Sequence, residues 1–272
     1  MSDRTPTFFI PHGGGPCFFM DWTMGPRDTW DTMAAWLKAM PDAVGRKPDA
    51  IIVISAHWEE PEFTVTTSPN PPLLFDYYGF PEHTYRLRYS APGSPELAHE
   101  VRGLLTRAGI VSKEDAARGL DHGVFIPFLL IYPQADIPVI QLSLKVGLNP
   151  VEHLAVGKAL ERLRDRNVLI VGSGMSYHNM EAYRRGLPPT LSGTFDAWLT
   201  DAATDLDPST RNEKLAHWAA APAARDAHPR EEHLIPLMVA AGAAGEDIGQ
   251  RTYSDRVMGS AISAYQFGGA NP

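Results

Sequence analysis

Three of the ten histidines in this 272-residue chain follow closely on short apolar runs. The runs and the histidines after them are Phe8–Ile10 with His12, Ile51–Ile54 with His57, and Val168–Val171 with His178. One histidine after a strand is usually a polar residue at the rim of a core. Three such placements favour a shared role, because neutral imidazole is a common protein ligand for zinc, iron, copper and nickel. Clustered histidines would repel one another if charged, and a shared cation would hold them together.

No local sequence motif fixes such a metal site. The chain has no HExxH, no CxxC and no paired-histidine helix motif. The glycines at 13–15 lack GxGxxG spacing and a Walker lysine, and GSGMS at 172–176 is not the GxSxG nucleophile elbow. A metal site would have to be assembled from remote segments, which spacing alone does not establish. On the residues alone, a metal site and a histidine cluster without metal both remain open.

The apolar runs alternate with segments of helical character. Strands are expected at Thr7–Ile10, Ala50–Ser55, Glu62–Thr67, Ile137–Ser143 and Val168–Val171. Helices are expected at Thr29–Met40, Pro95–Ala108, Val151–Arg166, Thr194–Ala203 and Glu232–Ala241. The alternation predicts an α/β fold, a single domain over 1–272 with a central, mostly parallel or mixed sheet flanked by helices. Ligands bind at the carboxyl edge of such sheets, where the three histidines would gather.

Two details follow from spacing and composition. The run Glu62–Thr67 follows the strand from Ala50 too closely for a helical crossover, so we expect a local antiparallel pair there. The segment SPNPPLLFDYYGFPEH is rich in proline and aromatic residues, which predicts a long ordered loop near the site.

Composition and charge exclude some classes of protein. Hydrophobic residues make up 44% and charged residues 21%, with a net charge of −8 and both signs mixed along the chain. A nucleic-acid surface would need a concentrated basic patch, so we expect no nucleic-acid partner. No stretch approaches the apolar length of a membrane span or a secretory signal, and Cys17 is the single cysteine. We therefore expect a cytoplasmic protein with no membrane partner.

Seven segments, taken in order, resemble one known family. They are FFIPHGGGP, VISAHW, GFPEHTYRLRYSAPGSPELA, GLDHGVFIPF, YPQADIPVIQLSL, SGMSYHNM and HPREEHLIPLMVAAGAAG. Each is weak alone, but the ordered set, from about Phe8 to about Gly245, resembles the class III extradiol ring-cleavage dioxygenases of the LigB superfamily, in the DOPA 4,5-dioxygenase-like branch. The resemblance implies that a catecholic compound is cleaved with O2 to a muconic-semialdehyde-type product. It implies Fe(II) for activity, with Zn(II) able to occupy the same site.

The resemblance also assigns residues. His12 and His57 match metal ligands of the family, and His233 matches the histidine of its EEHxxPL motif, which we expect to be the third ligand. Glu232 is the alternative third ligand, since a glutamate completes the site in the wider superfamily. His178 matches the histidine of the HN motif, and it is either the general base on the diol or a fourth ligand.

Further residues are expected around the pocket. His122, in DHG, matches a residue thought to assist near the substrate and oxygen, although it could instead cap a turn. The family's HGSP is HGGGP here, and this extra glycine predicts a wider loop in which Cys17 to Phe19 line a different pocket. The aromatic candidates for the substrate pocket are Trp58, Tyr77, Tyr78, Phe80 and Phe125. The histidines expected at the surface are His83, His99, His153 and His217, with His228 in a loop near the site.

Two other functions use the same residues. A zinc-dependent hydrolase would use the histidine cluster to activate water. A non-catalytic binding module would keep the cluster for structure alone. Ring cleavage by an iron-loaded protein discriminates the dioxygenase from both, because zinc has no redox change to offer.

Overall fold

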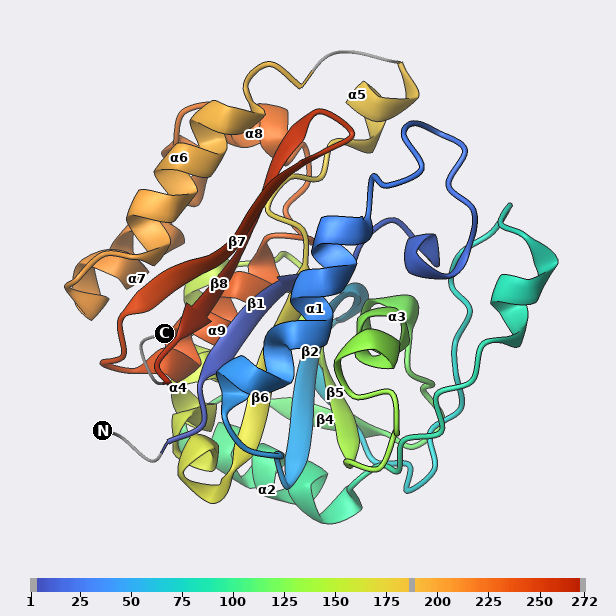
Figure 1. Cartoon of the computed structure of the whole chain (residues 1–272). Helices are drawn as coiled ribbons and strands as arrows, with labels where there is room; N and C mark the ends of the chain where they lie inside the picture. Colours follow the sequence, from blue (N-terminus) through green and yellow to red (C-terminus); the bar gives the residue numbers. More distant parts are fainter. Residues whose placement is uncertain (1–3, 186–188, 270–272) are drawn as a thin grey trace.

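The computed structural model describes residues 4–185 and 189–269. Within these ranges, eight strands form one mixed sheet in the order β4-β3-β5-β2-β6-β1-β8-β7 (Figure 1). The strands are β1 Thr7–Pro11, β2 Ala50–Glu60, β3 Phe63–Thr66, β4 Ser112–Asp115, β5 Val139–Lys145, β6 Val168–Gly174, β7 Gly249–Val257 and β8 Ser260–Phe267. The central strands β5, β2, β6 and β1 are parallel and almost wholly buried, as their continuous apolar runs require. The predicted α/β fold is confirmed.

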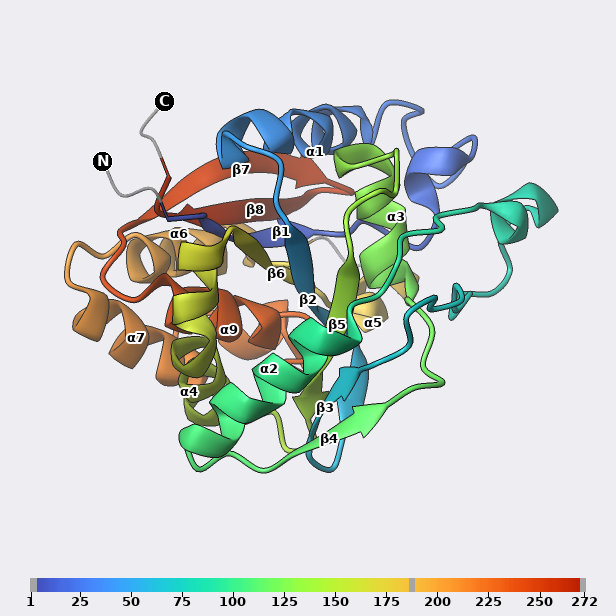
Figure 2. The ribbon, with the colours of Figure 1, turned by 90° about the horizontal axis from the view of Figure 1, so that it is seen from below.

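Helices cover both faces of this sheet. The α-helices of the described ranges are α1 Asp31–Val44, α2 Pro95–Arg107, α3 His122–Ile131, α4 Pro150–Leu160, α5 Met180–Arg184, α6 Ser192–Ala203, α7 Pro208–Ala216, α8 Ala224–Ala227 and α9 Ile235–Ala244. Figure 2 shows α1 and α3 on one face and α2, α4 and α9 on the other. No helix in the described ranges has the length and apolar content to cross a membrane.

The expected helices are present with shifted ends. Ser94 caps α2, because its side chain accepts a hydrogen bond from the Leu97 backbone N–H. The segment expected as one helix over Val151–Arg166 is divided into α4 and a 3-10 helix, Glu161–Arg166. The helix expected from Glu232 begins three residues later, at Ile235, so Glu232 and His233 lie in the loop that leads into it.

Strand β2 is longer than predicted, and this matters for the site. It was expected to end at Ser55 but continues to Glu60, and its register with β5 shifts between Ile54 and Glu59. His57 therefore lies inside an irregular part of a strand rather than after its end.

Other parts of the sheet differ from the predictions. The expected antiparallel pair of β3 with β2 is wrong: β3 pairs antiparallel with β5 and parallel with β4. The reason is that β5 and β6 already occupy the two sides of β2. The β7–β8 hairpin was not predicted; its turn has positive φ at Met258 and Gly259, and methionine is an unusual residue there.

Candidate metal centre

His12 lies directly after β1, at the carboxyl edge of the sheet. Its backbone N–H donates to the Gly174 carbonyl at 3.1 Å, which prolongs the pairing of β1 with β6. Its side chain is only 2% exposed, and Nδ1 donates to the Gly13 carbonyl at 2.9 Å. Because Nδ1 carries the proton in that hydrogen bond, Nε2 keeps a lone pair for another partner.

His57 points from the irregular part of β2 toward His12. The two Nε2 atoms lie 3.2 Å apart, and the ring centroids are 4.8 Å apart. The residues are 45 positions apart in sequence, and they meet because β2 and β1 flank β6 in the sheet. The sequence-based expectation that their side chains gather at one edge agrees with this placement.

His233 reaches the same place from the loop before α9. Two glycines of β6 permit this approach, because a Cβ on Gly174 would overlap the His233 carbonyl and one on Gly172 would overlap that of Pro236. The His233 carbonyl accepts a hydrogen bond from the Met175 N–H at 3.0 Å. Nδ1 of His233 donates to the Glu232 carboxylate at 2.9 Å, and its buried Nε2 has no hydrogen-bond partner.

His12, His57 and His233 form a group whose ligand atoms lie within 4.8 Å of one another. Burial, together with the nearness of other histidines, holds the pKa of each imidazole well below its ordinary value. All three are therefore neutral at pH 7, the form that binds a metal. An unpaired, buried Nε2 on His233 would be costly by itself, so this donor set fits a divalent cation.

His178 and Glu232 form a second layer beside His233. The rings of His178 and His233 are stacked, with centroids 3.4 Å apart. Glu232 Oε1 lies 3.3 Å from His178 Nδ1 as well as 2.9 Å from His233 Nδ1. Burial acts to raise the pKa of Glu232, but the hydrogen bond with His178 and the charge of Arg230 lower it overall. One carboxylate thus faces both imidazoles.

His122, at the start of α3, lies on the other side of His57. Their ring centroids are 3.9 Å apart. Asp76 Oδ1 accepts hydrogen bonds from His122 Nδ1 at 2.8 Å and from its backbone N–H at 3.0 Å. Burial opposes ionisation of Asp76, but the hydrogen bonds from His122 lower its pKa overall. Sequence reasoning missed Asp76, although it lies in the aromatic loop that was expected near the site.

The aromatic candidates divide into two groups. Tyr77 is buried, with its ring 5.8 Å from His122, and Phe80 packs near it at 5.5 Å. Tyr78 is 91% exposed, so it does not line an enclosed pocket, and Phe125 is a core residue against Tyr77. Trp58 is buried beneath the guanidinium of Arg118 at 5.1 Å.

The expectations for Cys17 and for the remaining histidines are partly wrong. Cys17 is buried within its loop, where its Sγ accepts a hydrogen bond from the Gly14 N–H at 3.3 Å. His153 was expected at the surface but is fully buried; it donates to the Asn149 carbonyl and accepts from the Lys145 N–H. His83, His99 and His217 are exposed as predicted. His228 is buried, with Nε2 3.0 Å from the Ser176 carbonyl oxygen.

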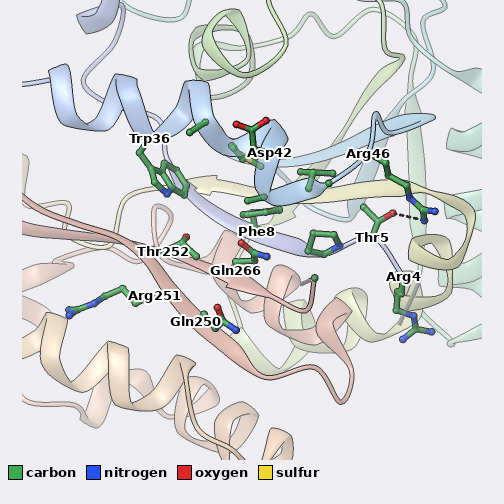
Figure 3. Close-up of a pocket in the computed structure, with 17 residues that line it drawn as sticks. Arg4, Thr5, Phe8, Trp36, Asp42, Arg46, Gln250, Arg251, Thr252 and Gln266 are labelled. Carbon is green, nitrogen blue, oxygen red and sulfur yellow. Dashed lines mark hydrogen bonds between the residues drawn. The ribbon is translucent and has the colours of Figure 1, made fainter. Parts of the chain in front are cut away.

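A cavity of about 790 Å³, drawn in Figure 3, is lined by none of these histidines. Its walls include Trp36 and Asp42 of α1, Thr5 just before β1, Phe8 near the start of β1, and Gln266 near the end of β8. The start of β1 is the opposite edge of the sheet from His12. The candidate metal centre is therefore identified by the chemistry of its side chains and not by the size of a cavity.

Comparisons with known proteins identify the family of the chain. A family model for the catalytic LigB subunit of aromatic ring-opening dioxygenase matches residues 6–268. The 4,5-DOPA dioxygenase extradiol of Beta vulgaris is 40% identical, with 89% of this chain and 87% of that protein covered. Dioxygenase tasH of Hapsidospora irregularis is 36% identical over 98% of this chain and 86% of its own. The crystal structure of an uncharacterized protein from Escherichia coli K12 has a TM-score of 0.77 at 28% identity, covering 97% of this chain and all of that one.

Proposed function

The chain belongs to the LigB family of aromatic ring-opening dioxygenases and is an extradiol ring-cleavage enzyme, and we propose that it uses Fe(II) and O2 to open the ring of a catecholic compound. The product would be of the muconic-semialdehyde type. The observation that carries this proposal is the convergence of three neutral imidazoles, one of which has a buried Nε2 without a partner. The family assignment supports a dioxygenase over the zinc-dependent hydrolase and the binding module considered from sequence.

His12, His57 and His233 would hold the metal through their Nε2 atoms. When bound, Fe(II) in a three-ligand site supplies open coordination positions and the redox chemistry that joins an aromatic diol to dioxygen. Zn(II) would fit the same ligands but lacks that redox change. We assign Glu232 the role of orienting His233, because its carboxylate accepts the Nδ1 proton and leaves Nε2 as the donor atom.

His178 would act as the general base. Glu232 lies beside its Nδ1, which favours the tautomer whose Nε2 can accept a proton from a catechol hydroxyl. The same group would return the proton later in the reaction. His178 is about a quarter exposed, so it is accessible to a substrate at the site.

His122 would hydrogen-bond the substrate or oxygen on the opposite side. Its Nδ1 is held by Asp76, so its ring orientation is fixed, and its Nε2 is the atom left for this contact. Tyr77 lies against His122 and would form part of the wall around an aromatic ring. We further propose that the whole chain acts as one catalytic domain. A cytoplasmic location is compatible with its single, unpaired Cys17.

A direct test is purification under anaerobic conditions, loading with Fe(II), and addition of catechols and O2. The proposal predicts a strongly coloured semialdehyde and one O2 consumed per ring opened. A zinc-loaded sample is the matched control and should produce neither signal. Hydrolysis of an ester or amide by the zinc form, with no ring opening by the iron form, would support the hydrolase instead.

A further inference from the structure

The backbone around His57 cannot rely on the sheet for its hydrogen bonds. Pairing of β2 with β6 is regular only as far as Ser55, and the register with β5 breaks between Ile54 and Glu59. A buried peptide group without a ladder partner must find another one, or it destabilises the fold. The conformation that directs the His57 imidazole therefore depends on side chains.

Two side chains supply the hydrogen-bond partners of the His57 backbone N–H and C=O groups. Ser55 Oγ accepts a hydrogen bond from the His57 N–H at 3.2 Å. The Arg118 guanidinium donates to the His57 carbonyl at 3.1 Å. These contacts replace the missing ladder hydrogen bonds on either side of the imidazole.

Both side chains meet at one buried carboxylate, that of Asp121. Asp121 Oδ1 accepts from Ser55 Oγ at 2.7 Å. Asp121 Oδ2 accepts from Arg118 at 3.2 Å and from Gln141 Nε2 at 2.7 Å. The side chain of Asp121 is fully buried, so each of its acceptor contacts is made within the protein.

Asp121 is also the residue before α3, whose first residue is His122, and its backbone carbonyl accepts hydrogen bonds from the Val124 and Phe125 N–H groups. The next residue, Gly123, allows this turn to lie close to β2, because a Cβ there would come 2.5 Å from Ser55 Oγ and 3.1 Å from the His57 ring. Asp121 therefore connects the two elements: its carboxylate contacts Ser55 of β2, and its backbone carbonyl contacts the first turn of α3. The close approach of His57 and His122 rings follows from this packing.

We propose that Arg118 and Asp121 are positioning residues that hold His57 in the orientation needed for metal binding. This inference rests on the proposed function, since it takes His57 as a ligand together with His12 and His233. Neither residue needs to touch the metal or the substrate. Loss of such outer contacts usually lowers metal affinity by about 10- to 100-fold.

The test uses metal-free full-length protein and does not depend on turnover. Zn(II) affinity is measured by competition with a chromophoric chelator, and the visible absorption of the Co(II) form reports the ligand geometry. The variants are Arg118→Met, which keeps the aliphatic stem, and Asp121→Asn, which keeps the size. Ser55→Ala is a milder change in the same network and carries the test if Asp121→Asn fails to fold.

Arg211→Met is the matched control for the loss of a buried arginine. Arg211 is fully buried and donates to the carbonyls of Ala241, Gly245 and Asp247 at the far end of α9. We expect this variant to lower the melting temperature and leave Zn(II) affinity within about twofold of the wild type. Arg118→Lys, which keeps a donor near the His57 carbonyl, should recover part of the affinity lost in Arg118→Met.

The expected result is a Zn(II) affinity lower by about tenfold or more in Arg118→Met and Asp121→Asn, with an altered Co(II) spectrum. Unchanged affinity and spectrum, with melting temperatures reduced as in Arg211→Met, would overturn the inference and leave the network a purely structural role. Failure of the proposed function can be distinguished from failure of this inference. Wild-type protein that binds metal at the histidines but opens no catechol ring would refute the iron-dependent catechol reaction. The test of Arg118 and Asp121 as positioning residues would remain valid.

Discussion

The imidazoles of His178 and His233 are stacked, with centroids 3.4 Å apart and planes inclined by only 16°. Their Nδ1 atoms both face Oε1 of Glu232, at 3.3 Å and 2.9 Å. His233 is buried with a strongly lowered pKa, whereas His178 is partly exposed. The two rings share one carboxylate, and His233 belongs to two groups of donor atoms: one with His12 and His57, and one with His178 and Glu232. Because His178 lies outside the group formed by His12, His57 and His233, we propose that His233 is a metal ligand and His178 the general base.

The first prediction concerns His178. If it is the base, His178→Ala should retain most of the bound metal while kcat for ring cleavage falls by about 10²- to 10⁴-fold. His57→Ala is the comparison, and it should lose metal and turnover together. Metal content measured on both purified variants decides the matter. An equal loss of metal in the two variants would make His178 a ligand.

The second prediction is that loss of the Glu232 charge weakens both metal binding through His233 and catalysis through His178. Glu232→Gln keeps the size of the side chain but removes the charge that holds the two Nδ1 protons. We expect metal affinity to fall by about 10- to 100-fold and the rate at saturating metal to fall as well. Metal titration followed by assays at saturating Fe(II) separates the two effects. Complete loss of metal even at high concentration would instead indicate that Glu232 is a direct ligand.

Acid should destabilise the metal-free protein through its buried histidines. Burial lowers the pKa of His153 to about 4 and that of His228 to about 3, whereas the unfolded chain takes up these protons near pH 6.5. The unfolded state therefore binds more protons below pH 6.5, and stability falls as the pH decreases from 6.5 toward about 4 for His153 and about 3 for His228. Each group contributes roughly 1.4 kcal/mol per pH unit within its window.

His153→Gln tests this explanation away from the metal centre. Melting temperatures of the chelator-treated protein are compared between pH 7 and pH 4. The variant should lose stability less steeply than the wild type, because it lacks one of the protonation sites. Parallel curves for the two proteins would show that His153 does not contribute.

The glycine-rich loop after His12 should determine the position of Phe80, which we expect to line the substrate pocket. Gly15 has φ +57°, and a Cβ there would come 2.8 Å from the Phe80 ring. Gly15→Ala should therefore displace Phe80 and raise KM for a catechol by about tenfold, a loss of roughly 1.4 kcal/mol of binding. Gly45→Ala is the control, since Gly45 has φ +80° with open space around it. The control should lose about 1–2 kcal/mol of stability from backbone strain and keep its KM.

Equal KM values in the two glycine variants would contradict a role for Phe80 in the substrate pocket. The melting temperatures of both variants are measured as well. Backbone strain should lower the melting temperature of both variants, whereas only Gly15→Ala disturbs the contact with Phe80.

The sequence predicted the parts of the site that depend on strand order. Buried apolar runs identify the parallel strands, and the carboxyl edge of those strands is where His12 and His57 meet. The irregular pairing of β2 could not be predicted, because it depends on Ser55, Arg118 and Asp121, which come together only in the folded chain. Asp76 was missed because a long loop carries it to His122 without any periodic pattern.

Helix α3 and the last hairpin were missed for local reasons. Residues His122–Ile131 are apolar on nearly every face and contain Pro127, so they show no helical periodicity. Strand β7 mixes charged and polar residues at an edge of the sheet, and its apolar positions, such as Tyr253 and Val257, are widely spaced. Tertiary packing rather than local pattern fixes both elements.

The most direct test of the account is to locate the metal by anomalous diffraction from a crystal loaded with Fe(II) or Zn(II). We predict one metal ion per chain, within bonding distance of Nε2 of His12, His57 and His233. Glu232 should stay hydrogen-bonded to Nδ1 of His233 and should not contact the metal. A metal held by Glu232 and His178 away from His12, or His12 and His57 without a common ion, would contradict it.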